Sequence, residues 1–305
     1  MASEDASFTR LGVYKVAGKA FNPKTHRILD TKWVFKTKRD ANGKITKYKA
    51  RLVARGFRQR EGIDYDETFS PVLHYKSLRT LLAIAAQCGL ELKVMDVVTA
   101  YLYAPLYEEI FIKTPVGFAG QEGLILQLLK QLYGLKQAGR GWNHFLVKAL
   151  IEIGYTPCKW SDECVLFKRS KTGQTMYIGT FVDDMPYAYR KNDEAEMDAD
   201  KAKLLLKFEI KDLGDAETIL GMRVTRDRAA GTITLDQETY IKRILVQFGF
   251  GQCKTAPTPE LVTGDEAGAM PTAKRHTLDV SDVNKISVNN FSSAVGALGY
   301  AQGAT

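Results

Sequence analysis

Two adjacent carboxylates inside a strand pattern constrain this chain more than any other feature of its sequence. Residues 175–190, TMYIGTFVDDMPYAYR, alternate as two strands do, and Asp183 and Asp184 stand together between them. We expect a tight hairpin with these two aspartates as its two-residue loop, because Asp tolerates turn geometry and bonds its own backbone. Taken alone, such a pair is most often a solvated turn, so the rest of the sequence must decide its role.

A third aspartate lies in a segment that reads as a buried strand. Residues 92–102, LKVMDVVTAYL, follow a predicted helix over 77–89 that has Ser77 as N-cap and Gly89 as its end. Asp96 stands in the middle of this strand, where an uncompensated carboxylate is costly to bury. Magnesium binds proteins through a few carboxylates plus substrate phosphates, and two such ions stabilise both oxygens of a phosphoryl displacement. A shared site of the three aspartates therefore predicts phosphoryl transfer.

Positive charge is concentrated at one end of the chain. Residues 1–60 hold 16 basic and 4 acidic side chains, a net charge of +12, although the whole chain carries only +8. Residues 33–57 read as a hairpin around Asn42-Gly43, with an apolar face and a face of cations made of Lys36, Lys38, Lys47, Lys49 and Arg51. This asymmetry favours a nucleic acid or another anionic partner.

Several classes of protein lose their usual evidence here. The four cysteines form no CxxC pair and the four histidines are scattered, so a zinc site or a disulfide framework is not expected. No GxSxG elbow, phosphate-binding glycine loop or HExxH motif is present. The sequence shows no apolar run of about 20 residues. We expect an intracellular protein without a membrane partner, whose chemistry depends on carboxylates.

The second half of the chain continues the alternation of helices and hairpins. Helices are predicted over 140–154 and 193–209, and a hairpin turning at Ala230-Gly231 precedes a helix from about Gln237. Residues 251–290 contain prolines, glycines and polar residues without a period, which is typical of a flexible linker. Residues 291–305 begin a new apolar pattern.

Five blocks, in order, resemble the reverse transcriptase of copia-type LTR retrotransposons. They are KYKARLVARGFRQREGIDYDETFSPV, VMDVVTAYLYAPLYEEIFIKTPVGF, LKQLYGLKQAGRGW, FVDD and FEIKDLGDAETILGMRV. The resemblance implies an α+β right-hand polymerase within residues 1–250, with fingers at about 20–90, a ferredoxin-like palm at about 91–235 and a small thumb at about 236–250. In such a palm, the nitrogen of Pro186 is expected to face the Asp96 strand. Residues 291–305 resemble the start of a connection toward an RNase H domain.

The resemblance also implies roles for individual residues. Asp96, Asp183 and Asp184 match the catalytic metal ligands, which would hold two Mg²⁺ ions or, alternatively, Mn²⁺. Tyr101 matches an aromatic residue that excludes a ribose 2′-hydroxyl, and Gln137 one that lies against the incoming nucleotide. The other implied positions are Lys49 and Arg51 at the triphosphate, Leu220, Gly221 and Met222 at the primer end, and Lys36, Lys38, Lys47 and Phe181 along the primer and template.

The implied activity is RNA-directed DNA synthesis from deoxynucleoside triphosphates on a primed RNA or DNA template. Integrase and RNase H parts of a polyprotein would be further partners, and a cytoplasmic particle or the nucleus would be the location. One alternative is an eroded fragment that binds nucleic acid without catalysis. A departure such as QAGR where the family has QAPR leaves that alternative open. An unrelated magnesium phosphohydrolase would leave the five ordered blocks unexplained.

Overall fold

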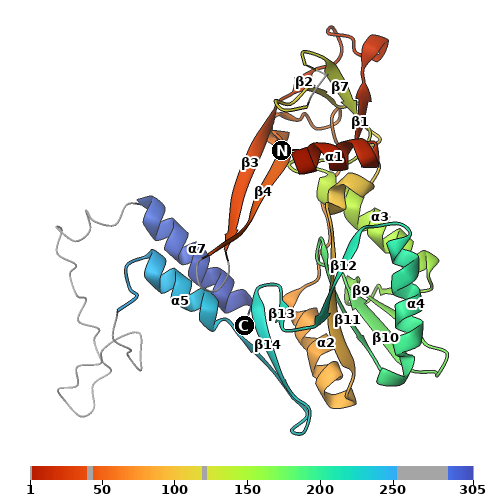
Figure 1. Ribbon diagram of the computed structural model, residues 1–305, viewed down its shortest axis with the longest axis vertical. Helices are drawn as coiled ribbons and strands as arrows, with labels where there is room; N and C mark the ends of the chain where they lie inside the picture. The colour runs from red at the N-terminus through yellow and green to blue at the C-terminus, as the bar shows by residue number, and fades with distance from the viewer. Residues whose placement is uncertain (1, 40–43, 119–121, 253–287, 305) are drawn as a thin grey trace. The chain divides into compact units, whose positions relative to one another are not determined.

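The computed structural model describes residues 2–39, 44–118, 122–252 and 288–304. It divides into two compact units, Met1–Ala216 with Asp227–Thr232, and Glu217–Arg226 with Ile233–Thr305. Helices and strands alternate throughout, and the described strands form several separate sheets (Figure 1). The chain is therefore a mixed α and β protein, as the sequence predicts.

A six-stranded sheet is the centre of the first unit. Its strands are joined in the order β12-β5-β11-β10-β9-β8, and every neighbouring pair is antiparallel. The bounds are β5 Glu91–Val97, β8 Thr156–Cys158, β9 Asp162–Arg169, β10 Thr175–Gly179, β11 Asp184–Tyr189 and β12 Ile210–Asp215. Strands β5 and β11 lie side by side in the interior of the sheet, so the segments of all three aspartates come together.

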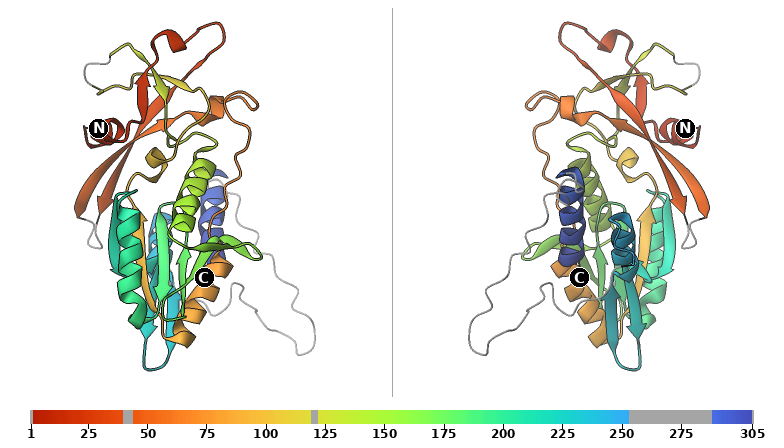
Figure 2. Two further views of the ribbon diagram at one scale, coloured as in Figure 1. Left: turned by 90° about the vertical axis from the view of Figure 1, so that its right-hand side faces the viewer. Right: turned by 90° about the vertical axis from the view of Figure 1, so that its left-hand side faces the viewer.

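Helices cover both faces of this sheet (Figure 2). On one face, α3 (Ala138–Glu152) and α4 (Glu194–Leu205) bury Trp142, Leu146 and Met197 against Met95 and Met185 of the strands. On the other face, α2 (Tyr75–Cys88) buries its apolar stripe of Leu78, Leu81, Leu82 and Ala85. The short 3-10 helix η4 (Lys191–Asp193) leads into α4. A sheet buried on both sides holds its side chains rigidly.

The predicted N-cap of α2, Ser77, is wrong by three residues, whereas the predicted end at Gly89 is confirmed. The helix begins at Tyr75, and the backbone N–H of His74 donates to the buried carboxylate of Asp162 at 2.9 Å. This partner comes from β9, so the local sequence around Ser77 gives no sign of it. Gly89 has φ +61°, a left-handed conformation that glycine adopts without strain.

The turn between β10 and β11 differs by one residue from the predicted one. Phe181 and Asp184 exchange both backbone hydrogen bonds, at 2.9 and 3.0 Å, so the two-residue loop is Val182-Asp183 and not Asp183-Asp184. The pairing of Pro186 changes with it. Pro186 lies opposite Val94 of β5, and continuing the β10–β11 register places Gly179 on its other side.

The expected loss of a bond between Pro186 and the Asp96 strand is therefore wrong. The N–H of Val97 donates to the carbonyl of Asp183 at 2.9 Å, and hydrogen-bonded and non-hydrogen-bonded pairs alternate along antiparallel strands. Pro186 and Val94 consequently form a non-hydrogen-bonded pair. The proline nitrogen points toward Gly179, where a Cβ atom would lie 3.2 Å from the proline ring. The sheet accommodates Pro186 by placing glycine beside it.

The predicted strand over 92–102 ends earlier than expected, at Val97. Thr99 has φ +56° and turns the chain into the 3-10 helix η3 (Ala100–Tyr103). A left-handed threonine cannot continue a strand. Tyr101 therefore lies on a turn of helix just beyond the edge where β5 carries Asp96.

The predicted cationic hairpin is confirmed as β3 (Thr31–Arg39) and β4 (Ile45–Ala54), although its tip at Asn42-Gly43 lies outside the described residues. Lys36 pairs with Lys49 and Lys38 with Lys47, whereas Trp33 pairs with Leu52. The helix α1 (Ala2–Leu11) and a four-stranded sheet in the order β1-β7-β6-β2 form a second core beside it. The remaining elements there are β1 Tyr14–Val16, η1 Gly18–Ala20, β2 Ile28–Leu29, η2 Gly56–Arg58, β6 Phe111–Lys113 and β7 Ile125–Leu128.

The second unit contains the predicted hairpin and helix. Its strands are β13 (Thr218–Ile219), β14 (Met222–Asp227) and β15 (Thr232–Asp236), followed by α5 (Glu238–Gln247). Helix α7 (Val288–Ala304) packs beside α5, with the rings of Tyr240 and Tyr300 4.8 Å apart (Figure 1). Most of the predicted linker over 251–290 lies outside the described residues.

Candidate active site

Two of the three predicted aspartates face each other across neighbouring strands. Asp96 of β5 and Asp184 of β11 are register partners, both half-buried. Because the adjacent pair of Val97 and Asp183 is hydrogen-bonded, Asp96 and Asp184 form a non-hydrogen-bonded pair, the kind whose Cα atoms approach to about 4.5 Å. Their side chains therefore share one face at one edge of the sheet.

Electrostatic repulsion is built into this pair. Burial, followed by the charges of Asp183 and Asp96, raises the pKa of Asp184 from its ordinary value to about 6. On the opposite side of β5, the register partner of Asp96 is the exposed Lys211 of β12. The site thus holds an excess of negative charge at neutral pH, which a bound cation would relieve.

The donor chemistry of the three aspartates fits a hard divalent cation, because carboxylate oxygens are what Mg²⁺ and Mn²⁺ prefer. The raised pKa of Asp184 fits as well, since it arises partly from the neighbouring carboxylates. Within the described ranges, no three His, Cys, Asp or Glu side chains converge as a group that could hold a metal ion. The acids are thus neighbours on one edge without forming a closed cage.

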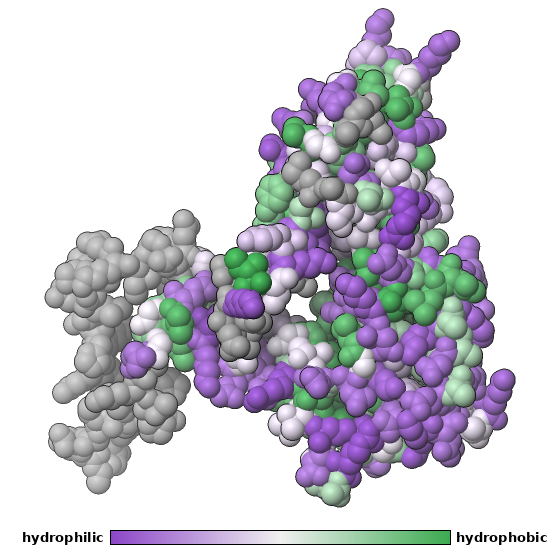
Figure 3. Space-filling model, viewed as in Figure 1, coloured by the Kyte–Doolittle hydropathy of each residue, from purple (hydrophilic) through white to green (hydrophobic). Residues whose placement is uncertain are grey.

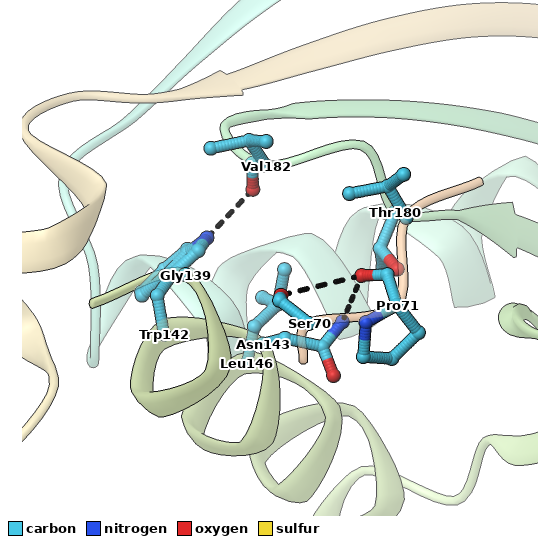
Figure 4. Close-up of a pocket in the computed structure, with 9 residues that line it drawn as sticks. Ser70, Pro71, Gly139, Trp142, Asn143, Leu146, Thr180 and Val182 are labelled. Atoms are coloured by element: carbon cyan, nitrogen blue, oxygen red, sulfur yellow. Dashed lines mark hydrogen bonds between the residues drawn. The ribbon is translucent and has the colours of Figure 1, made fainter. Parts of the chain in front are cut away.

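The turn that carries Asp183 is strained and tied to the helix beneath it. Val182 has φ +56°, a conformation that is costly for a β-branched residue. The indole N–H of Trp142, whose side chain is buried in α3, donates to the Val182 carbonyl at 2.6 Å (Figure 4). Trp142 therefore fixes the peptide that immediately precedes the central aspartate.

A small cavity lies beside this bond. It measures about 20 Å³ and is lined by Ser70, Pro71, Asn143 and Thr180, among others (Figure 4). That volume admits roughly one water molecule and excludes a nucleotide. The cavity belongs to the packing beneath the turn, so it is not a substrate pocket.

Aromatic and cationic residues from three separate segments meet near Asp183. The rings of Tyr101 and Tyr133 contact edge to face, with centroids 4.9 Å apart, and the Arg51 guanidinium lies 5.1 Å from the Tyr133 ring centroid. Burial raises the pKa of Tyr101, Asp183 raises it further, and Arg51 lowers it. Tyr101 and Arg51 thus contact the same ring, that of Tyr133, and Asp183 is close enough to act on the charge of Tyr101.

Gln137 occupies a different environment from the one expected for a residue facing a nucleotide. Its side chain is 4% exposed. Its amide nitrogen donates to the Asp64 carbonyl at 2.9 Å, and its oxygen accepts from Gln59 at 3.0 Å. Gln59 in turn accepts from the N–H of Lys136 at 2.8 Å. This buried network fixes the start of α3 against the loop of residues 59–64.

The predicted primer and template residues come from three parts of the chain. Lys36 and Lys47 are exposed on the hairpin, and the side chain of Lys38 lies outside the described residues; Lys49, predicted at the triphosphate, is half-buried on the same hairpin. Phe181 pairs with Asp184 at the turn. Leu220, Gly221 and Met222 belong to the second unit, where the Tyr300 hydroxyl donates to the Leu220 carbonyl at 2.8 Å and Met222 is fully buried.

Three residues near the aspartates escaped prediction from the sequence. Trp142 reads as one member of an apolar helical stripe, Tyr133 as part of a block around Gln137, and Lys211 as one charge among many. Their local patterns are ordinary, so only the contacts with distant segments distinguish them. In the sequence around Tyr133, only the glycine at position 134 indicates that another backbone segment approaches closely, because glycine leaves room for such an approach.

Comparison with known proteins identifies the family of the chain. Residues 13–262 match the family described as reverse transcriptase (RNA-dependent DNA polymerase). The chain is 39% identical over 304 residues to a retrovirus-related Pol polyprotein from transposon TNT 1-94 of Nicotiana tabacum, covering 99% of this chain and 22% of the relative.

Two further relatives have lower identity. A Pol polyprotein from transposon RE1 of Arabidopsis thaliana is 32% identical, over 78% of this chain and 16% of the relative. The Ty1-BL Gag-Pol polyprotein of Saccharomyces cerevisiae is also 32% identical, over 69% of this chain and 12% of the relative. The chain thus spans about a fifth or less of these relatives, and it belongs to the reverse transcriptase family of copia-type retrotransposon Pol polyproteins.

Proposed function

We propose that this chain is an RNA-directed DNA polymerase that adds deoxynucleotides to a primer 3′-hydroxyl. The observation that carries the proposal is the pairing of Asp96 with Asp184 across two central strands, next to the turn that holds Asp183. Family membership supports the same activity. Neighbouring carboxylates repel each other, and a bound cation would remove this repulsion, so their pairing is consistent with a metal site.

A right-hand arrangement is part of this proposal. The six-stranded antiparallel sheet would form the centre of the palm at about 91–235, and the cationic hairpin would belong to the fingers at about 20–90. Helix α5 would belong to a small thumb over about 236–250, and residues 291–305 would lead toward an RNase H domain. The linker over 251–290 would separate them.

Each group of residues would have a distinct task. Asp96, Asp183 and Asp184 would hold two Mg²⁺ ions, or Mn²⁺ in their place. When bound, such ions polarise the phosphates and offset charge that develops during displacement. Lys49 and Arg51 would orient the triphosphate by charge, and Tyr101 would close the space at the sugar 2′ position. Positioning and electrostatics supply most of the rate in phosphoryl transfer.

Contacts outside the chemical centre would fix the substrates. Lys36, Lys38 and Lys47 would bind template phosphates, and Phe181 would lie along the primer. Leu220, Gly221 and Met222 would contact the primer end. Gln137 would act on the nucleotide through the position of the α3 start, because its own amide is occupied by Gln59 and Asp64.

The proposed partners are a primed RNA or DNA template, deoxynucleoside triphosphates and the integrase and RNase H parts of a longer polyprotein. The proposed location is intracellular, in a cytoplasmic particle or the nucleus. No helix in the described part of the chain has the length and apolar character needed to cross a membrane. Figure 3 shows hydrophilic residues predominating on the visible surface of the first unit around its six-stranded sheet.

Primer extension on a homopolymer template, with and without magnesium, tests the proposal. We expect magnesium-dependent extension, and we expect Asp96→Asn or Asp183→Asn to reduce it by at least about a hundredfold while template binding persists. The matched control Asp198→Asn changes an exposed acid of α4. Wild-type extension by either active-site variant would contradict the assignment. Template binding without any extension by the unmodified chain would instead favour the eroded, non-catalytic alternative.

A further inference from the structure

Tyr133 connects two parts of the proposed nucleotide site that come from different segments. Its ring contacts Tyr101 edge to face at 4.9 Å, with an interplanar angle of 70°. The Arg51 guanidinium lies 5.1 Å from the centroid of the same ring. One half-buried ring therefore touches both the residue proposed for the sugar and the cation proposed for the triphosphate.

The backbone of Tyr133 is fixed to the strand that carries Arg51. The Ala54 N–H at the end of β4 donates to the Tyr133 carbonyl at 2.7 Å. Gly134 has φ +87°, and a Cβ atom there would lie 2.2 Å from the Ala54 oxygen. A Cβ atom on Gly56 would lie 2.0 Å from the Gly134 oxygen. These close backbone approaches hold the Tyr133 backbone against the end of β4.

Charges of both signs surround the Tyr133 phenol. Burial raises its pKa most; Arg51 lowers it, whereas Glu4 and Asp183 raise it, and the net effect is upward. The phenol therefore keeps its proton at physiological pH, and its ring attracts the Arg51 guanidinium as a cation–π contact. The Glu4 carboxylate comes from α1 and accepts from the Leu52 N–H of β4 at 3.4 Å. The Arg51 strand is thus held at its outer edge by Glu4 and by Tyr133.

We propose that Tyr133 is a positioning residue that couples triphosphate binding to sugar selection, an inference that rests on the proposed polymerase function. Without the ring, Arg51 loses the surface that orients it and Tyr101 loses the neighbour that keeps its ring in place. Both affinity for the nucleotide and discrimination against ribonucleotides depend on this one ring. Loss of Tyr101 alone removes discrimination and leaves the triphosphate contact in place.

The first measurement is the Kd of the nucleotide in a complex that cannot react. The full chain is bound to a template whose primer ends in a dideoxynucleotide, so that no bond can form. The next complementary deoxynucleotide is then titrated in with Mg²⁺, and the stabilisation of the complex gives the Kd of that nucleotide. We expect Tyr133→Leu to raise Kd by about tenfold and Tyr133→Phe to raise it less. Arg51→Gln and Tyr133→Leu together are expected to have little more effect than Arg51→Gln alone, because the two residues act as one unit.

Discrimination is the second measurement, from Kd for the ribonucleotide divided by Kd for the deoxynucleotide. Tyr133→Leu is expected to lower this ratio together with affinity, whereas Tyr101→Val lowers the ratio only. Tyr187→Phe is the control, since its fully buried hydroxyl has no hydrogen-bond partner among the described residues and its ring lies in the core of the six-stranded sheet. Tyr133→Met, which fills similar space without a ring, replaces the leucine variant if that variant unfolds on heating below the assay temperature.

Each outcome decides one question. Additive effects of Arg51→Gln and Tyr133→Leu, or an unchanged ribonucleotide ratio in both ring-less variants, would overturn the coupling role. A wild-type chain that binds the nucleotide but does not extend a 3′-hydroxyl primer would refute the proposed function, while the Kd comparison still tests Tyr133. A wild-type chain that binds no nucleotide would overturn both.

Discussion

The acidic edge of the six-stranded sheet and the basic hairpin both place like charges opposite each other on neighbouring strands, but the first lies on a buried sheet and the second on an exposed hairpin. Asp96 lies directly opposite Asp184, and Lys36 lies directly opposite Lys49. Like charges in directly opposed strand positions destabilise a sheet. At the acidic edge, a buried sheet and the Trp142 bond fix the opposed charges. On the hairpin, Phe35 is 67% exposed and Tyr48 75% exposed, so packing on the far face is thin.

This difference teaches where rigidity is needed. A reaction requires acids held to within a fraction of an ångström, so they belong on strands buried on both faces. Phosphate binding tolerates looser cations, since its attraction acts over a Debye length of about 10 Å at 0.1 M salt. Both regions carry repulsion that an oppositely charged ligand removes. Disturbing each region should therefore change different measurements.

The largest expected effect is on the hairpin. Replacing Lys36, Lys38, Lys47 and Lys49 by Gln should flatten the dependence of template affinity on salt, because each phosphate contact contributes a slope of roughly −0.7 to −0.9 in log affinity against log salt. Titrations of a labelled template at several salt concentrations measure it. The control replaces four exposed lysines of the first unit away from the hairpin: Lys171, Lys191, Lys203 and Lys207. An equal slope in both variants would locate the binding track elsewhere.

A middle-sized effect should come from the bond beneath the acidic turn. Trp142→Phe keeps an aromatic ring but leaves the Val182 carbonyl without its donor, which costs about 1–3 kcal/mol for a buried group. The melting temperature should fall by a few degrees and extension should slow, with salt dependence unchanged. Trp160→Phe is the control, because that side chain is fully exposed. Equal melting temperatures of the two variants would show that the turn does not depend on the indole.

The smallest expected effect is the pH dependence of stability. The folded pKa of Asp184, about 6, lies above its unfolded value of about 3.9. The free energy of unfolding therefore has its full contribution from protonated Asp184 below about pH 4, and this contribution is lost as the pH rises through about 6. Asp184→Asn removes that loss, so without divalent cations its advantage in melting temperature over the wild type should be larger at pH 7.5 than at pH 4.

A second aspartate provides a control of opposite sign for this prediction. Burial raises the pKa of Asp212, but its hydrogen bonds with Lys201, at 2.6 Å, and with the Gly214 N–H outweigh burial and lower it. Asp212→Asn should therefore lower the melting temperature at pH 7.5 and do so less at low pH. An Asp184→Asn variant that followed the same trend would refute a raised pKa of Asp184 at the acidic edge.

Sequence patterns predicted the helices, strands and helix ends that neighbouring residues determine. They missed the features that contacts with distant residues determine. Alternation identified the strands around Asp96 and the two-stranded hairpin, and Gly89 marked a helix end. The turn register was wrong by one residue because its strained Val182 is held by Trp142, 40 positions away. The α2 start was wrong for a similar reason, since its partner Asp162 comes from β9.

The candidate site shows the same division. The resemblance to a family named the acids, Arg51 and Tyr101; the structure pairs Asp96 with Asp184 and places Arg51 and Tyr101 against one ring, that of Tyr133. It also named Gln137, whose buried amide partners come from a loop about 75 residues earlier in the chain, beyond any local pattern. Tyr133 could not be identified from the sequence, because its proposed role depends on contacts with Tyr101 and Arg51, which come from separate segments.

The contact between Gly56 and Gly134 has a consequence for how copies of such a sequence decay. Any side chain at either position would collide with a backbone oxygen, at 2.0 Å in one case and 2.2 Å in the other. A single base change that turns either glycine into another residue would push β4 away from the Tyr133 segment. Such a copy would still read FVDD and still carry Asp96 intact. In a set of degenerating copies, these two glycines would therefore reveal a damaged nucleotide site even where the acidic residues are intact.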